Sequence, residues 1–179
     1  MHEYTDVFTW TYVEMLGLDT DIIVHKIPLI EGNVSVKQKT RRMRPDMLLK
    51  VKVEIQKQWV AGFLVVIHYP QWVANMVVVP KKDGKIRVCV DYRDLNKASP
   101  KDNFPLPHID ILVDNTAKNA TYSFMDEFSS YNQIRMEEED KEKTTFVTSW
   151  GTFCYKVMPF GLKNVGLCIS GRWSLYSMI

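Results

Sequence analysis

The sequence is poor in cysteine, and this excludes several classes of stabilised or metal-bearing protein. Its three cysteines, Cys89, Cys154 and Cys168, are widely separated and form no CxxC pair. Neither a disulfide framework nor a cysteine-based zinc site is therefore indicated. The four histidines also lack metal-ligand spacing. A reducing intracellular compartment, cytoplasmic or nuclear, is the expectation from this composition.

Long apolar segments and a strong net charge are also lacking. No apolar run approaches the roughly 20 residues that a membrane helix requires, and the polar start of the chain is unlike a signal peptide. We therefore expect no membrane partner. The formal net charge of +2 does not by itself indicate a nucleic-acid binder. The hydrophobic content of 46% is sufficient for one domain with a core.

Charge is nevertheless concentrated locally. Residues 37–52 and residues 81–101 are strongly basic, whereas residues 137–143 (EEEDKEK) are mainly acidic. A polyanion could follow the two basic runs. A solvated surface would have the same composition, so charge alone leaves both interpretations open.

A helix is predicted to begin at Pro45 and to stop at Gly62. Proline suits the first helical turn and glycine suits the end of a helix. The apolar face of this helix would consist of Leu48, Val51, Ile55 and Trp59.

A β-hairpin is predicted next, with strands at residues 76–79 and 86–90. The connection contains Asp-Gly, a strong hairpin signal, and places Lys81, Lys82 and Lys85 at the tip. Arg87 alternates onto the polar face of the second strand.

The remaining elements follow from turn residues and apolar runs. Residues 98–107 read as a proline-rich connection, and residues 109–115 as a short helix. Residues 122–125 read as a buried strand that ends at Asp126. A second hairpin is predicted over residues 144–158, turning at Trp150 and Gly151, and a helix begins near Leu162.

Three groups of residues could carry chemistry, although each is a modest signal alone. A carboxylate such as Asp126 at the end of a rigid strand can hold a divalent ion, but most such acids are caps or turn residues. The basic hairpin tip could neutralise a triphosphate, but such tips are usually solvated. In the run Met158–Asn164, Gly161 allows close approach of a base or sugar, and Lys163 could reach a phosphate.

The order and spacing of these motifs resemble a known family. The stretches WVANMVVVPKKDGKIRVCVDYRDLNKASPKDNFPLPHID, YSFMDEFSSYNQIRM and KTTFVTSWGTFCYKVMPFGLKN are similar to the reverse transcriptase of gypsy-type LTR retrotransposons, and most similar to plant members. The segment before them resembles the lead-in to that domain within the Pol polyprotein. The resemblance extends from about Glu3 to Gly166.

The resemblance implies a metal site and a set of partners. Asp126 would be the first metal-binding aspartate, and the Glu127 carbonyl would lie beside the same Mg²⁺, with Mn²⁺ as an alternative ion. Phe160, Gly161 and Lys163 would lie beside the incoming nucleotide and the template. The partners would be an RNA or DNA template with its primer, and a deoxynucleoside triphosphate.

The resemblance also implies how the nucleotide is held. Lys81 or Lys82, together with Arg87, would grip the triphosphate. Tyr131 would be the aromatic gate whose ring clashes with a 2′-hydroxyl. Ser130 stands where the family usually has glycine.

The implied fold is α+β: the fingers and the first half of the palm of a right-hand polymerase, with packed helices on antiparallel sheet. Fingers segments are expected at about 35–104 and 136–160. We divide the chain into a lead-in at 1–34, a partial reverse transcriptase domain at 35–165 and a divergent tail at 166–179.

The family's second catalytic motif, Tyr-x-Asp-Asp, does not occur in the 179 residues. One carboxylate cannot hold two ions in line, so the chain alone is expected to be inactive. With one choice of codons, a shifted frame after Gly166 gives A-M-H-Q-R-A-M-V-T-L-F-N-D, which resembles the family's next helix. We therefore hypothesise a frameshift there. A non-catalytic nucleic-acid-binding module and a functionless decayed product remain the alternatives.

Overall fold

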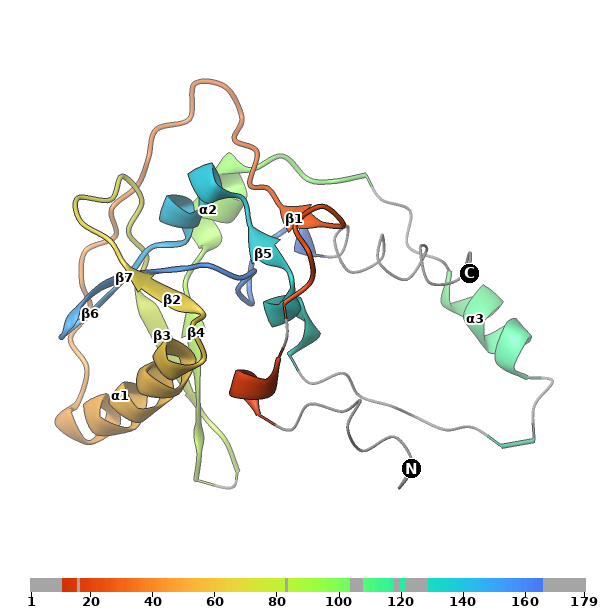
Figure 1. Ribbon diagram of the computed structural model, residues 1–179, viewed down its shortest axis with the longest axis horizontal. Coiled ribbons are helices and arrows are strands. Elements are labelled where there is room, and N and C mark those ends of the chain that lie inside the picture. Colours follow the sequence, from red (N-terminus) through yellow and green to blue (C-terminus); the bar gives the residue numbers. More distant parts are fainter. Residues whose placement is uncertain are drawn as a thin grey trace.

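The computed structural model describes residues 11–15, 17–82, 84–103, 108–117, 120–121 and 129–165. In these residues, one long helix and three small sheets form a mixed α+β body (Figure 1). The α+β class that the sequence predicts is confirmed. None of the described helices is long and apolar enough to cross a membrane.

Helix α1 (Pro45–Val60) begins and ends where the sequence predicts. Pro45 occupies the first turn, where its missing N–H costs nothing. The end is closed by Gly62, whose φ is +76°. The Gly62 N–H donates to the Trp59 carbonyl at 2.9 Å, and the Phe63 N–H donates to the Gln58 carbonyl at 3.0 Å. This paired closure satisfies carbonyls that the helix itself leaves open.

The buried face of α1 is narrower than the sequence pattern suggests. Val51 and Ile55 are buried, but Trp59 is 44% exposed. Trp59 instead packs edge-on against Phe153, with ring centroids 5.8 Å apart. Its place at the last turn of the helix puts it at the rim of the core.

The predicted basic hairpin is present as β3 (Met76–Pro80) and β4 (Ile86–Val90). The strands pair antiparallel from Met76↔Val90 to Pro80↔Ile86, and the hairpin extends past α1 (Figure 1). At the tip, the Lys81 N–H donates to the Lys85 carbonyl at 2.8 Å. The Lys50 ammonium of α1 donates to the Gly84 carbonyl at 3.3 Å, so the tip also contacts the helix.

The second predicted hairpin is also present, as β6 (Phe146–Thr148) and β7 (Gly151–Tyr155). A strand that the sequence did not predict, β2 (Leu64–Val66), pairs with the other edge of β7. The order of this sheet is β2-β7-β6. A bridge between Ala74 and Phe146 joins it to the start of the basic hairpin.

The lead-in segment is packed onto the body. Strand β1 (Val24–His25) pairs in parallel with β5 (Arg135–Met136). The buried Asp140 carboxylate accepts the Ile27 N–H, and Lys143 donates to the Ile27 carbonyl at 2.9 Å. Asp140 belongs to η4 (Glu138–Thr144), which lies in the acidic run. The acidic run therefore anchors the lead-in, and the boundary at residue 34 stays a prediction.

Two further helices flank the body. Helix α2 (Arg93–Ala98) follows β4 directly and was not predicted. Helix α3 (Ile109–Thr116) matches the predicted short helix and stands apart from the sheets (Figure 1). Val165 has helical backbone near the predicted last helix. The predicted strand at 122–125 and the tail at 166–179 lie outside the described residues.

The core lies where α1, the β2-β7-β6 sheet and the β3–β4 hairpin meet. Its largest fully buried apolar side chains include Phe146, Ile134, Met158 and Val51. Burying side chains of this size stabilises a fold by about 1.5–3 kcal/mol each. The core therefore fixes the hairpin relative to the segment that carries residues 129–136.

Candidate nucleotide-binding site

A cleft of about 310 Å³ lies between the basic hairpin, α1 and the segments that carry Tyr131 and Phe160. Four residues selected from the sequence line it: Lys81, Arg87, Tyr131 and Phe160. They come from positions up to 79 residues apart in the chain. We call this space the hairpin cleft. Its volume is at the lower end of the range for small-molecule sites, roughly 300–1,000 Å³.

One end of the hairpin cleft is aromatic. The rings of Tyr131 and Phe160 have centroids 6.1 Å apart and are tilted by 51°. Tyr131 belongs to η3 (Ser130–Gln133), and Ser129 precedes it with a φ of +51°. The Ser129 hydroxyl lies 3.5 Å from the Tyr131 hydroxyl. This left-handed turn at Ser129 directs Tyr131 into the cleft. Ser130 follows the turn as the first residue of η3.

The other end is cationic. Lys81 directly follows the first strand of the hairpin, and Arg87 belongs to its second strand. Both side chains are exposed. Neither forms an ion pair with another residue in the described part of the chain. Lys82 is exposed at the tip and does not line the hairpin cleft. An anion could therefore bind between Lys81 and Arg87 without displacing a carboxylate.

Among the lining residues that the sequence did not predict, three come from the lead-in and α1: Tyr12, Glu54 and Gln58. Glu54 pairs with Lys57 at 3.5 Å, and Gln58 accepts a hydrogen bond from the Tyr155 hydroxyl at 3.0 Å. Glu54 and Gln58 lie one helical turn apart on α1, so a 3.6-residue period could have shown that they share a face. Nothing local identifies Tyr12, because its position depends on how the lead-in packs.

The turn that carries Phe160 is fastened to α2 by Asn96. The Asn96 side chain donates to the Gly161 carbonyl at 2.8 Å and accepts the Lys163 N–H at 2.9 Å. Gly161 has a φ of +100°, which a side chain would make costly. Asn96 therefore fixes the backbone on both sides of Leu162, and through it the position of Phe160.

Lys163 is engaged away from the hairpin cleft. Its ammonium donates to the Asn96 carbonyl at 3.3 Å and to the Ser99 carbonyl at 3.0 Å. These carbonyls lie at the C-terminal end of α2, where a cation is favourable. A contact between Lys163 and a phosphate or template stays a prediction.

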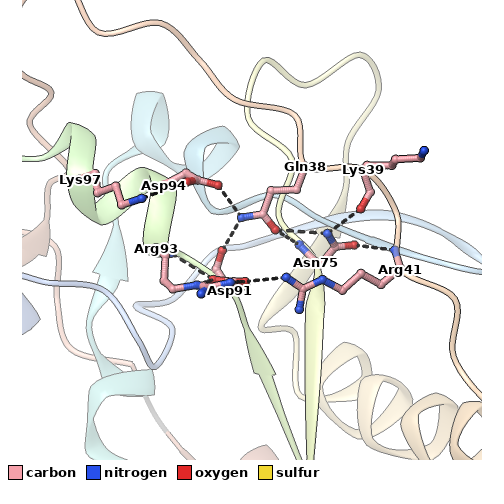
Figure 2. A network of polar contacts seen from close by, with 8 residues as sticks. All are labelled: Gln38, Lys39, Arg41, Asn75, Asp91, Arg93, Asp94 and Lys97. Carbon is pink, nitrogen blue, oxygen red and sulfur yellow. Dashed lines mark hydrogen bonds and ion pairs between the residues drawn. The ribbon is translucent and has the colours of Figure 1, made fainter.

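A polar network anchors the first basic run (Figure 2). The buried Asp91 carboxylate accepts two hydrogen bonds from the Arg93 side chain, at 2.8 and 2.7 Å, and lies 3.6 Å from Arg41. These cations, with Arg93 foremost, lower the pKa of Asp91. Gln38 bridges the Asp94 carboxylate, at 2.9 Å, and the Asn75 N–H, at 2.9 Å.

The backbone of residues 38–41 is thus held against β3 and α2. The Asn75 side chain donates to the Lys39 carbonyl at 2.9 Å and accepts the Arg41 N–H at 3.1 Å. The side chains of Lys37, Lys39 and Arg42 remain exposed. The basic run is therefore an ordered, outward-facing arm, which we call the basic arm (residues 37–44).

Comparison with known proteins identifies the family. The model of the family described as "Reverse transcriptase (RNA-dependent DNA polymerase)" matches residues 79–170, about half of the chain. The chain belongs to the reverse transcriptase family. The matched region includes every predicted site residue, from Lys81 to Lys163.

Individual relatives agree with the family. An "RNA-directed DNA polymerase homolog" of Oenothera berteroana is 43% identical over 79 residues, covering 44% of this chain and 56% of the relative. The "Retrovirus-related Pol polyprotein from transposon 412" of Drosophila melanogaster is 29% identical over 163 residues, covering 85% of this chain and 13% of the relative. The chain thus spans only part of the length of these relatives.

A solved structure shares the fold. The "Crystal structure of Prototype Foamy Virus Protease-Reverse Transcriptase (native)" superposes with a TM-score of 0.72 at 18% identity. The superposition covers 99% of this chain and 24% of the viral chain. The partial polymerase fold expected from the sequence is confirmed at this level.

The metal site that the sequence predicts lies outside the described residues, because Asp126 and Glu127 both fall there. Among the residues that are described, no group of three or more His, Cys, Asp or Glu side chains is placed to hold a metal ion. The assignment of Asp126 and Glu127 therefore stays a prediction.

Proposed function

We propose that the chain is the fingers and part of the palm of an RNA-directed DNA polymerase from an LTR retrotransposon Pol polyprotein, of gypsy type and similar to plant members. We further propose that the hairpin cleft binds the incoming deoxynucleoside triphosphate. The observation that carries this is the meeting of Lys81, Arg87, Tyr131 and Phe160 in one cleft. Their chemistry matches the phosphate end and the sugar end of a nucleotide.

The two ends would act differently on the ligand. Lys81 and Arg87 would neutralise the triphosphate through charge-assisted hydrogen bonds. Tyr131, held beside Phe160, would pack under the sugar and exclude a 2′-hydroxyl. In this arrangement the cations supply affinity and the aromatic pair supplies sugar selectivity.

Catalysis would require more than these residues. Asp126 and the Glu127 carbonyl would hold one Mg²⁺, which polarises the phosphate when bound. The 179 residues contain no Tyr-x-Asp-Asp motif to supply the second and third carboxylates. We therefore propose that this chain binds nucleotide but does not transfer it alone.

Primer extension tests the catalytic part of the proposal. The purified chain, given primer–template, deoxynucleotides and Mg²⁺ or Mn²⁺, is expected to add no nucleotide. Reproducible extension that disappears in Asp126→Ala would show that the chain is a complete catalyst and overturn this part.

Nucleic-acid binding without catalysis is a second candidate, and the anchored basic arm favours it (Figure 2). The arm's exposed cations would follow a phosphate backbone. Each lost phosphate contact reduces the slope of log affinity against log salt by about 0.9 for duplex DNA. Replacing Lys37, Lys39 and Arg42 by alanine should therefore flatten that slope by up to about 3. An unchanged slope would exclude this surface.

A further inference from the structure

Tyr12 belongs to the lead-in segment, yet its side chain lines the hairpin cleft together with Arg87, Tyr131 and Phe160. It lies 119 residues before Tyr131 and outside the matched family region of residues 79–170. The lead-in therefore contributes a side chain to a site otherwise built from the hairpin, α1 and the segments that carry Tyr131 and Phe160.

The position of Tyr12 is fixed by contacts on both sides. Its ring packs edge-on against buried Phe63, with centroids 5.5 Å apart. The short helical turn Tyr12–Glu14 is closed by the Met15 N–H, which donates to the Tyr12 carbonyl at 3.3 Å. Farther along, the Leu18 N–H donates to the Gln133 carbonyl at 2.8 Å. The lead-in is thus tied to the same short segment that carries Tyr131.

The Tyr12 hydroxyl lies at the aromatic end of the hairpin cleft. Tyr12 also lines an adjoining cavity of about 40 Å³, which it shares with Tyr131 and Phe160 but not with Lys81 or Arg87. This places Tyr12 at the proposed sugar end of the hairpin cleft.

The phenol of Tyr12 is suited to donate a hydrogen bond. Burial, and next the charge of Glu54, raise the pKa of Tyr12, while a hydrogen bond with Ser129 acts in the opposite direction. The phenol therefore stays protonated at neutral pH. Because a phenol both donates and accepts, the hydroxyl can keep Ser129 as a partner while it contacts a ligand.

We propose that Tyr12 is a further nucleotide-contacting residue, whose hydroxyl hydrogen-bonds the 3′-hydroxyl of a deoxynucleoside triphosphate in the hairpin cleft. The inference rests on the proposed function. The 3′-hydroxyl is the expected partner because it is the only sugar hydroxyl of a deoxynucleoside triphosphate. It makes the lead-in a part of the nucleotide site that distinguishes a deoxynucleotide from a chain-terminating dideoxynucleotide.

The test is equilibrium binding of dATP and of 2′,3′-dideoxy-ATP to the wild-type chain and to Tyr12→Phe. Removing one neutral hydrogen bond should weaken dATP binding roughly 3- to 10-fold. Binding of dideoxy-ATP should not change, because that ligand has no hydroxyl to lose. Tyr69→Phe is the matched control: Tyr69 is 94% exposed and does not line the cleft, so neither affinity should move.

The outcomes separate the inference from the proposed function. If the wild-type chain binds neither nucleotide, the proposed function fails and the inference falls with it. If the wild type binds dATP but does not prefer it over dideoxy-ATP, only the inference is overturned. The same holds if Tyr12→Phe weakens both ligands equally, because Tyr12 then acts only through packing. Unchanged dideoxy-ATP binding by the variant shows that its fold is intact.

Discussion

Asn96 joins α2 to the turn that carries Phe160, and its replacement by alanine should affect both stability and nucleotide binding. The substitution removes the hydrogen bonds to the Gly161 carbonyl and from the Lys163 N–H, at 2.8 and 2.9 Å. The two bonds of the Lys163 ammonium to main-chain carbonyls remain, because they do not use the Asn96 side chain. The turn should therefore loosen without detaching.

The size of the stability loss follows from these contacts. A neutral hydrogen bond contributes about 1 kcal/mol net, and water can replace part of each one here because Gly161 is exposed. Alanine has a higher helix propensity than asparagine, and this offsets roughly 0.5 kcal/mol of the loss. The free energy of unfolding should fall by about 1–1.5 kcal/mol, which lowers the melting temperature of a chain of this size by roughly 2–6 °C. In the variant, dATP would have to order the loosened turn that carries Phe160 when it binds. Because this ordering costs free energy, dATP affinity should fall roughly fivefold.

Thermal unfolding and dATP titration of Asn96→Ala measure the two effects, and Thr148→Val is the matched control. The Thr148 hydroxyl accepts the Trp150 and Gly151 N–H groups, at 3.0 and 3.1 Å, in the β6–β7 turn. Its loss should lower stability by a similar amount and leave dATP affinity unchanged. If Asn96→Ala loses stability but binds dATP like the wild type, Asn96 serves folding only and the argument is refuted.

Two further predictions concern pH and charge. Burial lowers the pKa of His25 from 6.5 to about 4. As the pH falls, His25 is therefore protonated in the unfolded chain before it is protonated in the folded chain. The free energy of unfolding consequently decreases between pH 6.5 and 4, by about 3 kcal/mol in full. Urea unfolding at pH 7 and 5 should show a smaller difference in His25→Gln than in the wild type, and an equal difference would contradict this. Glu54→Gln should tighten dATP binding roughly 2- to 5-fold, because it removes a negative charge from the hairpin cleft. Unchanged or weaker binding, measured by the same titration, would show that Glu54 does not face the phosphates.

Elements with strong local signals could be predicted from the sequence. Pro45 and Gly62 delimit α1, and the Asp-Gly pair at residues 83–84 marks the basic hairpin, because each signal acts within one turn of the chain. Strand β2 was missed because its partner Tyr155 lies 91 residues away from Leu64. The parallel pairing of Val24 with Arg135 was missed for the same reason.

The candidate site was predictable to a similar extent. Motif order selected Lys81, Arg87, Tyr131 and Phe160, and the structure brings these four together. Tyr12 was missed because only the packing of the lead-in brings it there. Sequence reasoning did not predict that the Lys163 ammonium donates to two carbonyls at the C-terminal end of α2, because it did not predict α2 itself. Side chains that depend on an unpredicted element cannot be placed from local pattern.

Equilibrium binding of dATP to the purified chain tests the central claim most directly, since the hairpin cleft is proposed to hold the incoming nucleotide. The wild type should bind dATP saturably at one site. Replacing both Lys81 and Arg87 by alanine should weaken binding roughly 10- to 30-fold, because two charge-assisted contacts to phosphate are lost. Replacing Lys37 and Lys39, an equal charge loss on the basic arm, should change it little. Absence of saturable binding, or equal affinities in all three proteins, would contradict the account.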